Sequence, residues 1–387
     1  MEEKKAPKLR FEGFNQDWEQ LKFSEVLKVN SGRDYKHLEE GDIPVYGTGG
    51  YMLSVNDKLS DIDGIGIGRK GTINKPQYLK APYWTVDTLF YITAKKGYNL
   101  NFLYSMVQRI NWKRMDESTG VPSLSKNVIE KVHKEFPSYD EQAKIGFFFK
   151  QLDDALALHQ RKIEKLQLLK QAFLQKMFVN QGHFPEVRFA EFSREWEQRK
   201  LGELTKVTSV KRIHQSDWTD SGVRFLRARD IVSKSKNEEP ADYLYISQEK
   251  YNEYSKLSGK VSPGDLLVTG VGTIGVPLLI IDNTPVYFKD GNIIWFKNEK
   301  KIEGYFFYYS FINNTIQKYI RDVAGVGTVG TYTIDSGKKT PIALPIGEEQ
   351  QKIGSFFKQL DVTIALHQKK LTNLKQLKKA FLQSMFI

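Results

Sequence analysis

The chain of 387 residues carries 58 Lys and Arg against 46 Asp and Glu, and this formal charge of +12 favours nucleic acid as a partner before any membrane surface. Its length allows two or three domains, and its 40% of hydrophobic residues can fill several cores. It has no cysteine, which excludes disulfides and thiolate metal sites, and no apolar leader or long apolar run, so we expect a cytoplasmic protein that is neither secreted nor membrane-spanning.

The opening segment of the chain, Pro7–Ser31, occurs a second time as Pro185–Ser209. Trp18-Glu19 in the first copy aligns with Trp196-Glu197 in the second, at an offset of 178 residues. Internal repeats of this kind indicate a duplicated structural unit.

The first variable region follows, and we expect it to fold together with the opening segment as one domain, residues 1–140. Asp63–Ile67 and Leu89–Thr93 are rich in β-branched and aromatic residues and predict strands, whereas Asn101–Arg114 predicts a helix. The mixture indicates a compact α+β domain.

The next segment, Glu141–Phe178, returns as Glu349–Phe386 with 25 identities in 38 aligned positions and no gap, which chance does not produce. Neither copy contains proline, and apolar residues recur at alternating steps of three and four, which is heptad spacing. The predicted seam residues are Phe149, Leu152, Leu156, His159, Ile163 and Leu166 in the first copy and Phe357, Leu360, Ile364, His367, Leu371 and Leu374 in the second.

These two helical segments, taken as residues 141–180 and 349–387, are predicted to pair with each other. One narrow apolar stripe on a helix roughly 55 Å long needs another helix to cover it. Two similar halves usually associate about a two-fold axis, which makes the helices antiparallel and puts one variable domain at each end of a central rod. His159 and His367 occupy equivalent seam positions and are interpreted as register-setting polar residues rather than metal ligands.

The second half begins after a short hinge, Val179–Pro185, and we expect residues 181–348 to form a second α+β domain. The two repeat offsets differ by 30 residues (208 − 178), so this half carries about 30 additional residues. The predicted elements are strands at Asp265–Thr269, Leu278–Asp282 and Asn292–Phe296 and a helix at Ile302–Arg321.

Catalytic motifs are not found in the sequence. There is no GxxxxGK[ST] loop, and the six histidines lack metal-site spacing. Gly270–Gly275 (GVGTIG) resembles a dinucleotide fingerprint, but Pro277 argues against the helix that must open there. Two alternatives stay open at this point: a methyltransferase or nucleotide-binding enzyme that uses this loop, and an adaptor that assembles proteins.

Several motifs, all present twice, together resemble the specificity subunits of type I restriction–modification systems over essentially the whole chain. The first half has Trp18-Glu19, Pro137 before Glu141-Gln142, and Gln151-Leu152-Asp153. The partners in the second half are Trp196-Glu197, Pro345, Glu349-Gln350 and Gln359-Leu360-Asp361.

Three inner motifs also resemble elements of that family's target-recognition domains. They are IPVYGTGG (Ile43–Gly50), STGVPSL (Ser118–Leu124) and GDLLVTGVGTIG (Gly264–Gly275). One departure is visible, because the second half has AGVGTVGTYT (Ala324–Thr333) where the first has STGVPSLS.

The resemblance implies a non-catalytic DNA-reading subunit with two pseudo-symmetric α+β target-recognition domains joined by an antiparallel coiled coil. In such a family each domain reads one part of a split double-stranded DNA target and the helices set the spacer. Two methyltransferase subunits dock on the repeated frame for adenine methylation, and restriction–translocase subunits add DNA cleavage. S-adenosylmethionine, ATP and Mg²⁺ then belong to those partners, and this chain needs no cofactor.

DNA contacts are expected from cations and from backbone amides in glycine-rich loops, because these groups hold phosphates and read base edges. GRKGT (68–72) places two cations among glycines that let the backbone approach DNA closely. Arg227 and Arg229 would share one face if their segment is a strand. The predicted DNA-contacting residues are Arg33, Lys36, Tyr46, Arg69, Lys70 and Thr72 in the first domain and Lys211, Arg212, Arg224, Arg227, Arg229 and Thr273 in the second.

Overall fold

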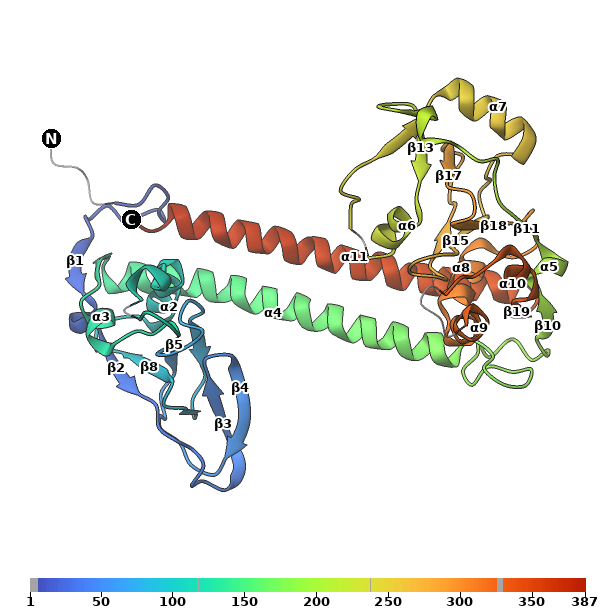
Figure 1. Cartoon of the computed structure of the whole chain (residues 1–387). Helices are drawn as coiled ribbons and strands as arrows, with labels where there is room; N and C mark the ends of the chain where they lie inside the picture. The colour runs from blue at the N-terminus through green and yellow to red at the C-terminus, as the bar shows by residue number, and fades with distance from the viewer. Residues whose placement is uncertain (1–5, 117, 237, 326–329) are drawn as a thin grey trace. The chain divides into compact units, whose positions relative to one another are not determined.

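The computed structural model describes residues 6–116, 118–236, 238–325 and 330–387 (Figure 1). It divides into two compact units. Unit 1 contains residues up to Arg161 together with His367–Ile387, and unit 2 contains Lys162–Leu366. Each unit therefore takes part of its long helices from both halves of the chain.

Unit 1 is built on a four-stranded antiparallel sheet in the order β2-β8-β5-β6, with a three-stranded sheet β4-β3-β7 and a ribbon β1-β9. The strands are β1 Glu19–Lys22, β2 Leu27–Ser31, β3 Glu40–Gly47, β4 Gly50–Val55, β5 Gly64–Gly68, β6 Gln77–Leu79, β7 Trp84–Thr85, β8 Leu89–Ala94 and β9 His133–Phe136. The short helices are α1 Phe23–Val26, α2 Leu100–Arg109, η1 Trp112–Met115 and α3 Lys126–Glu130. The side chain of Asn99 starts α2 because it accepts from the backbone N–H of Phe102.

Unit 2 repeats the four-stranded sheet in the order β11-β18-β15-β16, again antiparallel throughout. A second sheet has the order β12-β14-β13-β17, and β10 pairs with β19. The strands are β10 Glu197–Lys200, β11 Lys206–Thr208, β12 Trp218–Thr219, β13 Val223–Leu226, β14 Leu244–Ile246, β15 Leu266–Thr269, β16 Pro277–Leu279, β17 Val286–Phe288, β18 Ile293–Lys297 and β19 Pro341–Leu344. The helices are α5 Leu201–Leu204, η2 Gln215–Asp217, α6 Ala228–Ser235, α7 Gln248–Ser258, α8 Gly304–Ile312, α9 Asn314–Ala324 and α10 Ile334–Lys339.

Most of the additional residues of the second half lie between β13 and β15. Between β3 and β5 of unit 1 the chain forms only β4, whereas between β13 and β15 of unit 2 it forms α6, β14 and α7. The two domains therefore share a sheet topology and differ in what is inserted beside it.

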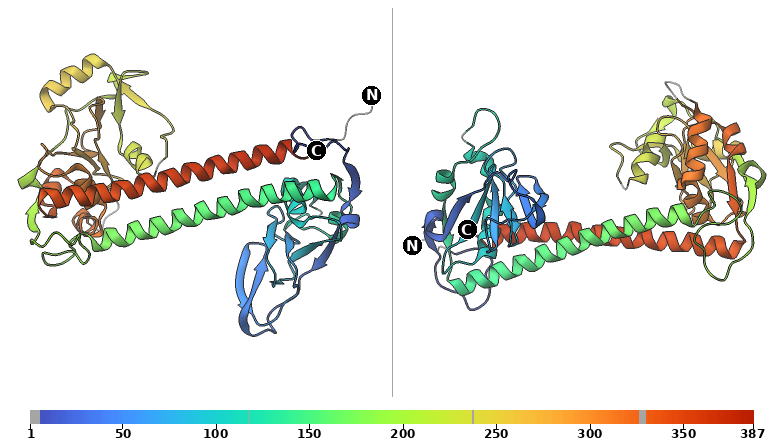
Figure 2. Two further views of the ribbon diagram at one scale, coloured as in Figure 1. Left: turned by 180° about the vertical axis from the view of Figure 1, so that it is seen from behind. Right: turned by 90° about the horizontal axis from the view of Figure 1, so that it is seen from below.

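The two repeated segments form the long helices α4 (Tyr139–Lys176) and α11 (Gly347–Ser384), which Figure 2 shows side by side in both of its views. In unit 1, His159 of α4 meets His367 of α11, with 2.8 Å between their Nδ1 atoms, and the earlier Asp153 meets the later Lys378. In unit 2, Lys170 meets Asp361 and the later Phe173 meets the earlier Phe356. Partner numbers fall as α4 advances in each unit, so the predicted antiparallel pairing is confirmed.

The predicted seam residues face the interior of this helix pair. Phe149 and Phe357 are fully buried, Ile163 and Ile364 are 5% and 8% exposed, and the other predicted seam positions are buried or partly buried. The heptad pattern thus identified the contacting face correctly.

Three predicted elements had wrong bounds. The helix expected over Ile302–Arg321 is broken into α8 and α9 at Asn313, whose backbone is extended and whose side chain caps the second helix. The helix expected over Asn101–Arg114 ends at Arg109, and a 3-10 turn follows. The strand expected at Leu278–Asp282 starts instead at Pro277, which is tolerated because β16 lies at the edge of its sheet.

Candidate nucleic-acid interface

The repeated opening segments anchor each domain to a long helix through the same ion pair. In unit 1, Arg10 donates from Nε and Nη2 to the two carboxylate oxygens of Glu141 at 2.6 and 2.7 Å. In unit 2, Arg188 does the same to Glu349, at 2.7 Å for both bonds. Both carboxylates are fully buried, and the hydrogen bond that Arg10 donates to Glu141 raises the pKa of Arg10 although burial opposes it. This bidentate geometry fixes where each domain sits on the first turns of its helix.

The repeated tryptophans complete the same anchor. Trp18 packs edge-on against Phe102 of α2, and Trp196 packs edge-on against Phe306 of α8, with ring centroids 5.9 and 5.8 Å apart. Both tryptophans are nearly completely buried. The frame is therefore the same in both units, and differences between the units must lie in the loops that the frame carries.

Three loops that the sequence had singled out come together in unit 1. The backbone of Lys70 bridges to Ser123, and the N–H of Gly71 donates to the carbonyl of Pro122 at 2.8 Å. A Cβ atom on Gly71 would lie 3.9 Å from Oγ1 of Thr48 in the turn between β3 and β4. The motifs IPVYGTGG, GRKGT and STGVPSL thus form one continuous rim.

Asp116 organises the third of these loops. Its Oδ1 accepts from the backbone N–H and hydroxyl of Ser118 and from the backbone N–H of Ser123, at 2.8 to 3.0 Å. The hydrogen bond from Ser123, with those from Ser118, holds the pKa of Asp116 below its ordinary value. The carboxylate therefore positions Ser123 where it meets Lys70.

The rim carries cations that are available to a ligand. Arg69, Lys70 and Thr72 are exposed, as are Lys113 and Arg114 in the turn just before Asp116. Within the part of the chain that the structure describes, none of these four cations forms an ion pair. Such a surface suits phosphate groups.

The remaining predicted residues of the first domain lie beside the rim. Lys36 lines a cleft of about 760 Å³ together with Thr48 of the β3–β4 turn. Tyr46 is half-buried and packs edge-on against Tyr51, whose own ring is exposed. Arg33 has an exposed side chain, and its backbone N–H donates to Thr85.

Unit 2 has a loop equivalent to GRKGT, but without its cations. The N–H of Tyr332 donates to the carbonyl of Gly270 at 2.8 Å, as the N–H of Leu124 does to Arg69 at 2.9 Å in unit 1. Gly71-Thr72-Ile73 consequently matches Gly272-Thr273-Ile274, and both glycines have positive φ. Arg69 and Lys70 are replaced by Gly270 and Val271. Thr72 and Thr273 were both predicted contacts and are equivalent, whereas part of the predicted 324–333 loop (326–329) lies outside the described residues.

The glycine-rich loop of unit 2 is a turn between antiparallel strands. It joins β15 to β16, and the hydroxyl of Thr269 donates to the carbonyl of Thr273 and accepts from the N–H of Val276. No helix opens after it, so GVGTIG lacks the strand–turn–helix context that a dinucleotide fingerprint requires.

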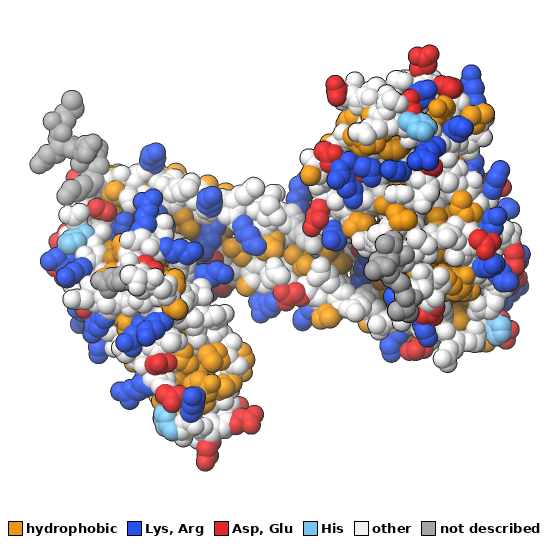
Figure 3. Space-filling view, in the orientation of Figure 1, with side chains coloured by type: hydrophobic (Ala, Val, Ile, Leu, Met, Phe, Trp, Pro, Cys, Tyr) orange, Lys and Arg blue, Asp and Glu red, His pale blue; other side chains and the backbone are white. Residues whose placement is uncertain are grey.

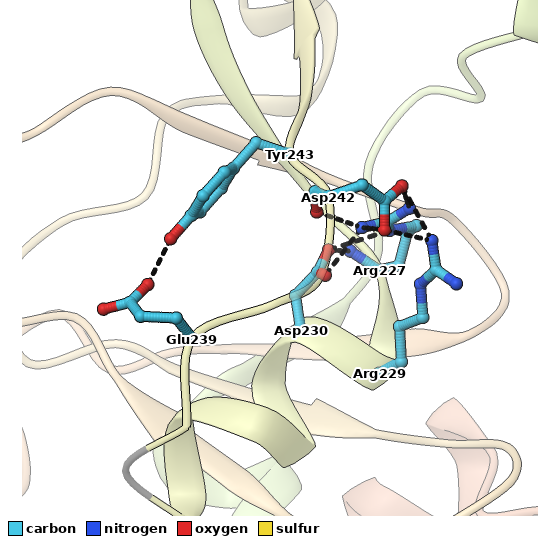
Figure 4. A network of polar contacts seen from close by, with 6 residues as sticks. All are labelled: Arg227, Arg229, Asp230, Glu239, Asp242 and Tyr243. Atoms are coloured by element: carbon cyan, nitrogen blue, oxygen red, sulfur yellow. Dashed lines mark hydrogen bonds and ion pairs between the residues drawn. The ribbon is translucent and has the colours of Figure 1, made fainter.

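Arg227 and Arg229 of unit 2 do not lie on a strand. The prediction that they would share one face of a strand is therefore wrong. β13 ends at Leu226, and Arg227 starts helix α6, in which Arg229 lies. Figure 4 shows both guanidinium groups turned toward Asp242, and Arg227 also binds Asp230. The hydrogen bonds that Arg227 donates to Asp230 and Asp242 raise the pKa of Arg227 although burial opposes them.

Arg224 differs from these two arginines. It lies on β13, and its guanidinium carbon is 3.7 Å from the ring centroid of Tyr243. Lys211 and Arg212 have exposed side chains before η2, and the backbone of Lys211 is held by Ser258 and Tyr287. In Figure 3 Lys and Arg side chains gather on the visible face of each unit.

The described residues form neither a metal centre nor a membrane span. No group of three or more His, Asp or Glu side chains is arranged to hold a metal ion. None of the helices in that part of the chain combines the length and apolarity needed to cross a bilayer.

The sequence model of the family described as type I restriction modification DNA specificity domain matches residues 15–168 and again residues 193–376. The chain belongs to this family. The two matched stretches coincide with the two halves that the anchors define, so each half is one specificity domain with its helix.

Relatives of this chain are named as specificity subunits of type I restriction enzymes. The type I restriction enzyme MjaVIII specificity subunit of Methanocaldococcus jannaschii is 25% identical over 85% of this chain and 77% of its own length. A putative type I restriction enzyme specificity subunit of Haemophilus influenzae is 23% identical over 90% of this chain and 89% of its own. The chain is accordingly a DNA-specificity subunit of a type I restriction system, a recognition protein rather than a catalytic one.

Solved structures agree with the fold. The S subunit of a type I system from M. genitalium superposes with a TM-score of 0.69 over 99% of both chains at 15% identity. A chain from a structure that concerns complex assembly and conformational transition of the type I R-M system gives 0.50, over 95% of this chain and 97% of that chain, also at 15% identity.

In this specificity subunit, sequence reasoning missed two kinds of residue. Lys113 and Arg114 were overlooked because they sit at the end of a predicted helix, although only three residues separate them from the STGVPSL motif. Asp116 was overlooked because its role is to shape a loop. The shared Gly-Thr-Ile tripeptides were the signal that could have aligned the two rims.

Proposed function

We propose that this specificity subunit reads a two-part double-stranded DNA target, one part with the loops of each unit, and that α4 and α11 set the spacing between the parts. The observation that carries this proposal is an identical anchor holding different loops. Arg10–Glu141 and Arg188–Glu349 repeat nearly atom for atom, whereas Arg69-Lys70 in one rim corresponds to Gly270-Val271 in the other. Two domains that share a scaffold but differ in their loops are suited to recognise two different DNA sequences.

The helix pair has features that suit a spacer of fixed length. Lys170 and Lys378 occupy seam positions where apolar residues are usual, and they pair with Asp361 and Asp153 at 2.5 and 2.6 Å. A helix shifted along its partner would leave these partly buried charges unpaired, at a cost that discourages sliding.

The frame also offers repeated apolar surface to protein partners. Leu158 and its counterpart Leu366 are 45% and 51% exposed, and Leu169 and its counterpart Leu377 are 43% and 44% exposed. Large hydrophobic residues exposed at matching helix positions favour a partner that binds twice. We assign these positions to two methyltransferase subunits, which bring S-adenosylmethionine, while restriction subunits bring ATP and Mg²⁺.

Methylome sequencing of cells with and without this gene, in the presence of its methyltransferase, tests the proposal. The expected result is loss of adenine methylation at one motif made of two specific parts separated by a fixed number of unspecified bases. Exchange of residues 32–136 for the same region of another family member should change one part only. A motif without two parts would contradict the proposal.

The enzyme alternative is tested on the isolated chain. S-adenosylmethionine and nucleotide binding, measured by calorimetry, should be absent if recognition is the role. The adaptor alternative is tested by gel shift on random duplex pools with and without methyltransferase, since an adaptor selects no sequence.

A further inference from the structure

The three neighbouring arginines of unit 2 differ in what holds them. Arg227 donates to Asp230 and Asp242 at 2.7 to 3.3 Å, and its side chain is 14% exposed. Arg229 donates to both oxygens of Asp242 at 2.8 and 2.9 Å. As Figure 4 shows, Asp242 thereby ties its loop to helix α6. These two arginines maintain the local fold.

Within the described residues, Arg224 forms no ion pair with a carboxylate. Its guanidinium lies over the ring of Tyr243 at 3.7 Å and near that of Tyr245 at 5.8 Å. Among the described residues its Nη1 atom is buried and has no hydrogen-bond partner. A buried, unpaired donor costs free energy unless a ligand completes it.

A cavity lies beside Arg224. It has a volume of about 360 Å³ and is lined by Arg224, Tyr243 and the apolar side chains of Leu226, Leu278 and Val286. Stacking on Tyr243 fixes the plane of the guanidinium, which reduces the conformational entropy lost on binding.

The charges around the cavity select the kind of ligand. Besides Arg224, the cavity is lined by one further cation, Lys234, and by four carboxylates, whose excess of negative charge disfavours a phosphate group. The carboxylates belong to Asp230, Glu238, Glu239 and Asp282. The edge of a base carries no net charge and avoids this repulsion. Two parallel N–H donors match the O6 and N7 acceptors that guanine presents in the major groove.

Arg224 is also specific to the second domain. The N–H of Val86 donates to Tyr46 on β3, and the N–H of Lys289 donates to Leu226 on β13, so these strands are equivalent. Arg224 lies two residues before Leu226, and the matching position in unit 1 is Pro44, which has no donor. A contact made here therefore distinguishes the two parts of the target.

We infer that Arg224, stacked on Tyr243 beside this cavity, reads a guanine in the part of the target that unit 2 recognises. This inference rests on the proposed function and names one base within it. Arg227 and Arg229 then support the loop that carries Tyr243 and do not read bases.

The experiment uses the full chain with its methyltransferase and a duplex of the methylated sequence, with 7-deazaguanine placed at each guanine in turn. For the natural chain, one position should lose affinity by roughly 5- to 100-fold, because the N7 acceptor is removed. R224A should bind the normal duplex more weakly and show no further loss at that position. R199A is the matched control and should keep the loss, because Arg199 is ion-paired with Glu203 and does not line this cavity.

R224K keeps the positive charge and removes the planar guanidinium, so it should behave like R224A toward 7-deazaguanine. The salt dependence of its binding should equal that of the natural chain. R224K also provides the test of the inference if R224A fails to fold. The inference is overturned if the loss persists in both variants, if no guanine is sensitive, or if R224A weakens all duplexes equally and lowers the salt slope by about one, as a phosphate contact does. A complex without any sequence preference would instead overturn the proposed function itself.

Discussion

Lys378 of α11 donates from Nζ to Oδ1 of Asp153 of α4 over 2.6 Å, at a seam position where heptad spacing favours an apolar residue. Gln108 of the first domain accepts from the same Nζ at 2.7 Å, so this lysine joins both long helices to α2. The lysine side chain is 13% exposed and the aspartate 32%. The contact is therefore a partly buried clamp rather than a surface ion pair.

The first prediction concerns this clamp. K378M alone should lower the free energy of unfolding by about 1–3 kcal/mol, because Asp153 keeps its desolvated charge without a partner. K378M/D153N should recover most of that loss, since methionine suits the seam and asparagine carries no charge. Urea titration followed by circular dichroism measures both. Equal destabilisation in the single and double variants would contradict the clamp.

The second prediction concerns the facing histidines. H159L/H367L should raise the free energy of unfolding by about 1–2 kcal/mol, because leucines pack in a seam without desolvating ring nitrogens. The same variant should methylate targets with a wider range of spacers, since a polar seam pair specifies one register. Selection from a library of spacer lengths measures this. If the variant is more stable but still methylates targets of one spacer length, the histidines do not set the register of the helix pair.

The third prediction concerns the pH dependence of the rim. The pKa of Asp116 is lowered by hydrogen bonds from Ser123 and Ser118, so protonation favours the open loop. The stabilisation is complete above the ordinary value of 3.8 and is lost as the pH falls through the lowered pKa. The amide NMR signals of Ser118 and Ser123 should therefore stay constant from neutral pH down to about 5 and change only below the ordinary value. In D116A they should resemble an open loop at every pH.

The fourth prediction uses the unequal rims. K70A should reduce the slope of log affinity against log salt by about 0.9, because one phosphate contact is lost. V271K places a lysine at the equivalent position of unit 2 and should raise the slope by a similar amount. Binding of one duplex is measured from 50 to 300 mM salt, with K58A on the ion-paired Lys58 as a control that leaves the slope unchanged. If the slope of log affinity against log salt in K70A equals that of the natural chain, Lys70 does not contact a phosphate.

The helices and their partner face could be predicted because their information is local and repeated. Heptad spacing between Phe149 and Leu166 depends only on helix geometry, and the second copy supplies the partner. Packing inside the variable regions is different. The break at Asn313 depends on a side-chain cap that competes with helix continuation, and composition does not reveal it.

The roles of single arginines could not be predicted because their partners come from elsewhere in the fold. Arg227 is neutralised by Asp242, 15 residues further on, after helix α6 has turned the chain back. Arg224 lies only three residues before Arg227, and no carboxylate in the part of the chain that the structure describes forms an ion pair with it. A run of basic residues in a sequence does not tell which member is engaged.

The last prediction tests whether the helices measure distance. Four residues inserted after Arg161 in α4 and four after Leu366 in α11 lengthen both helices by about 6 Å, since each residue adds about 1.5 Å. Both points lie on the unit 2 side of the His159–His367 contact, at the boundary between the two units, so the pairing within each unit is kept. Base pairs are spaced about 3.4 Å apart, so the spacer should grow by one or two base pairs while both specific parts of the target stay the same. Insertion into α4 alone is the control and should abolish methylation, because it shifts every later seam contact. An unchanged spacer in the double insertion would show that something other than helix length sets the separation.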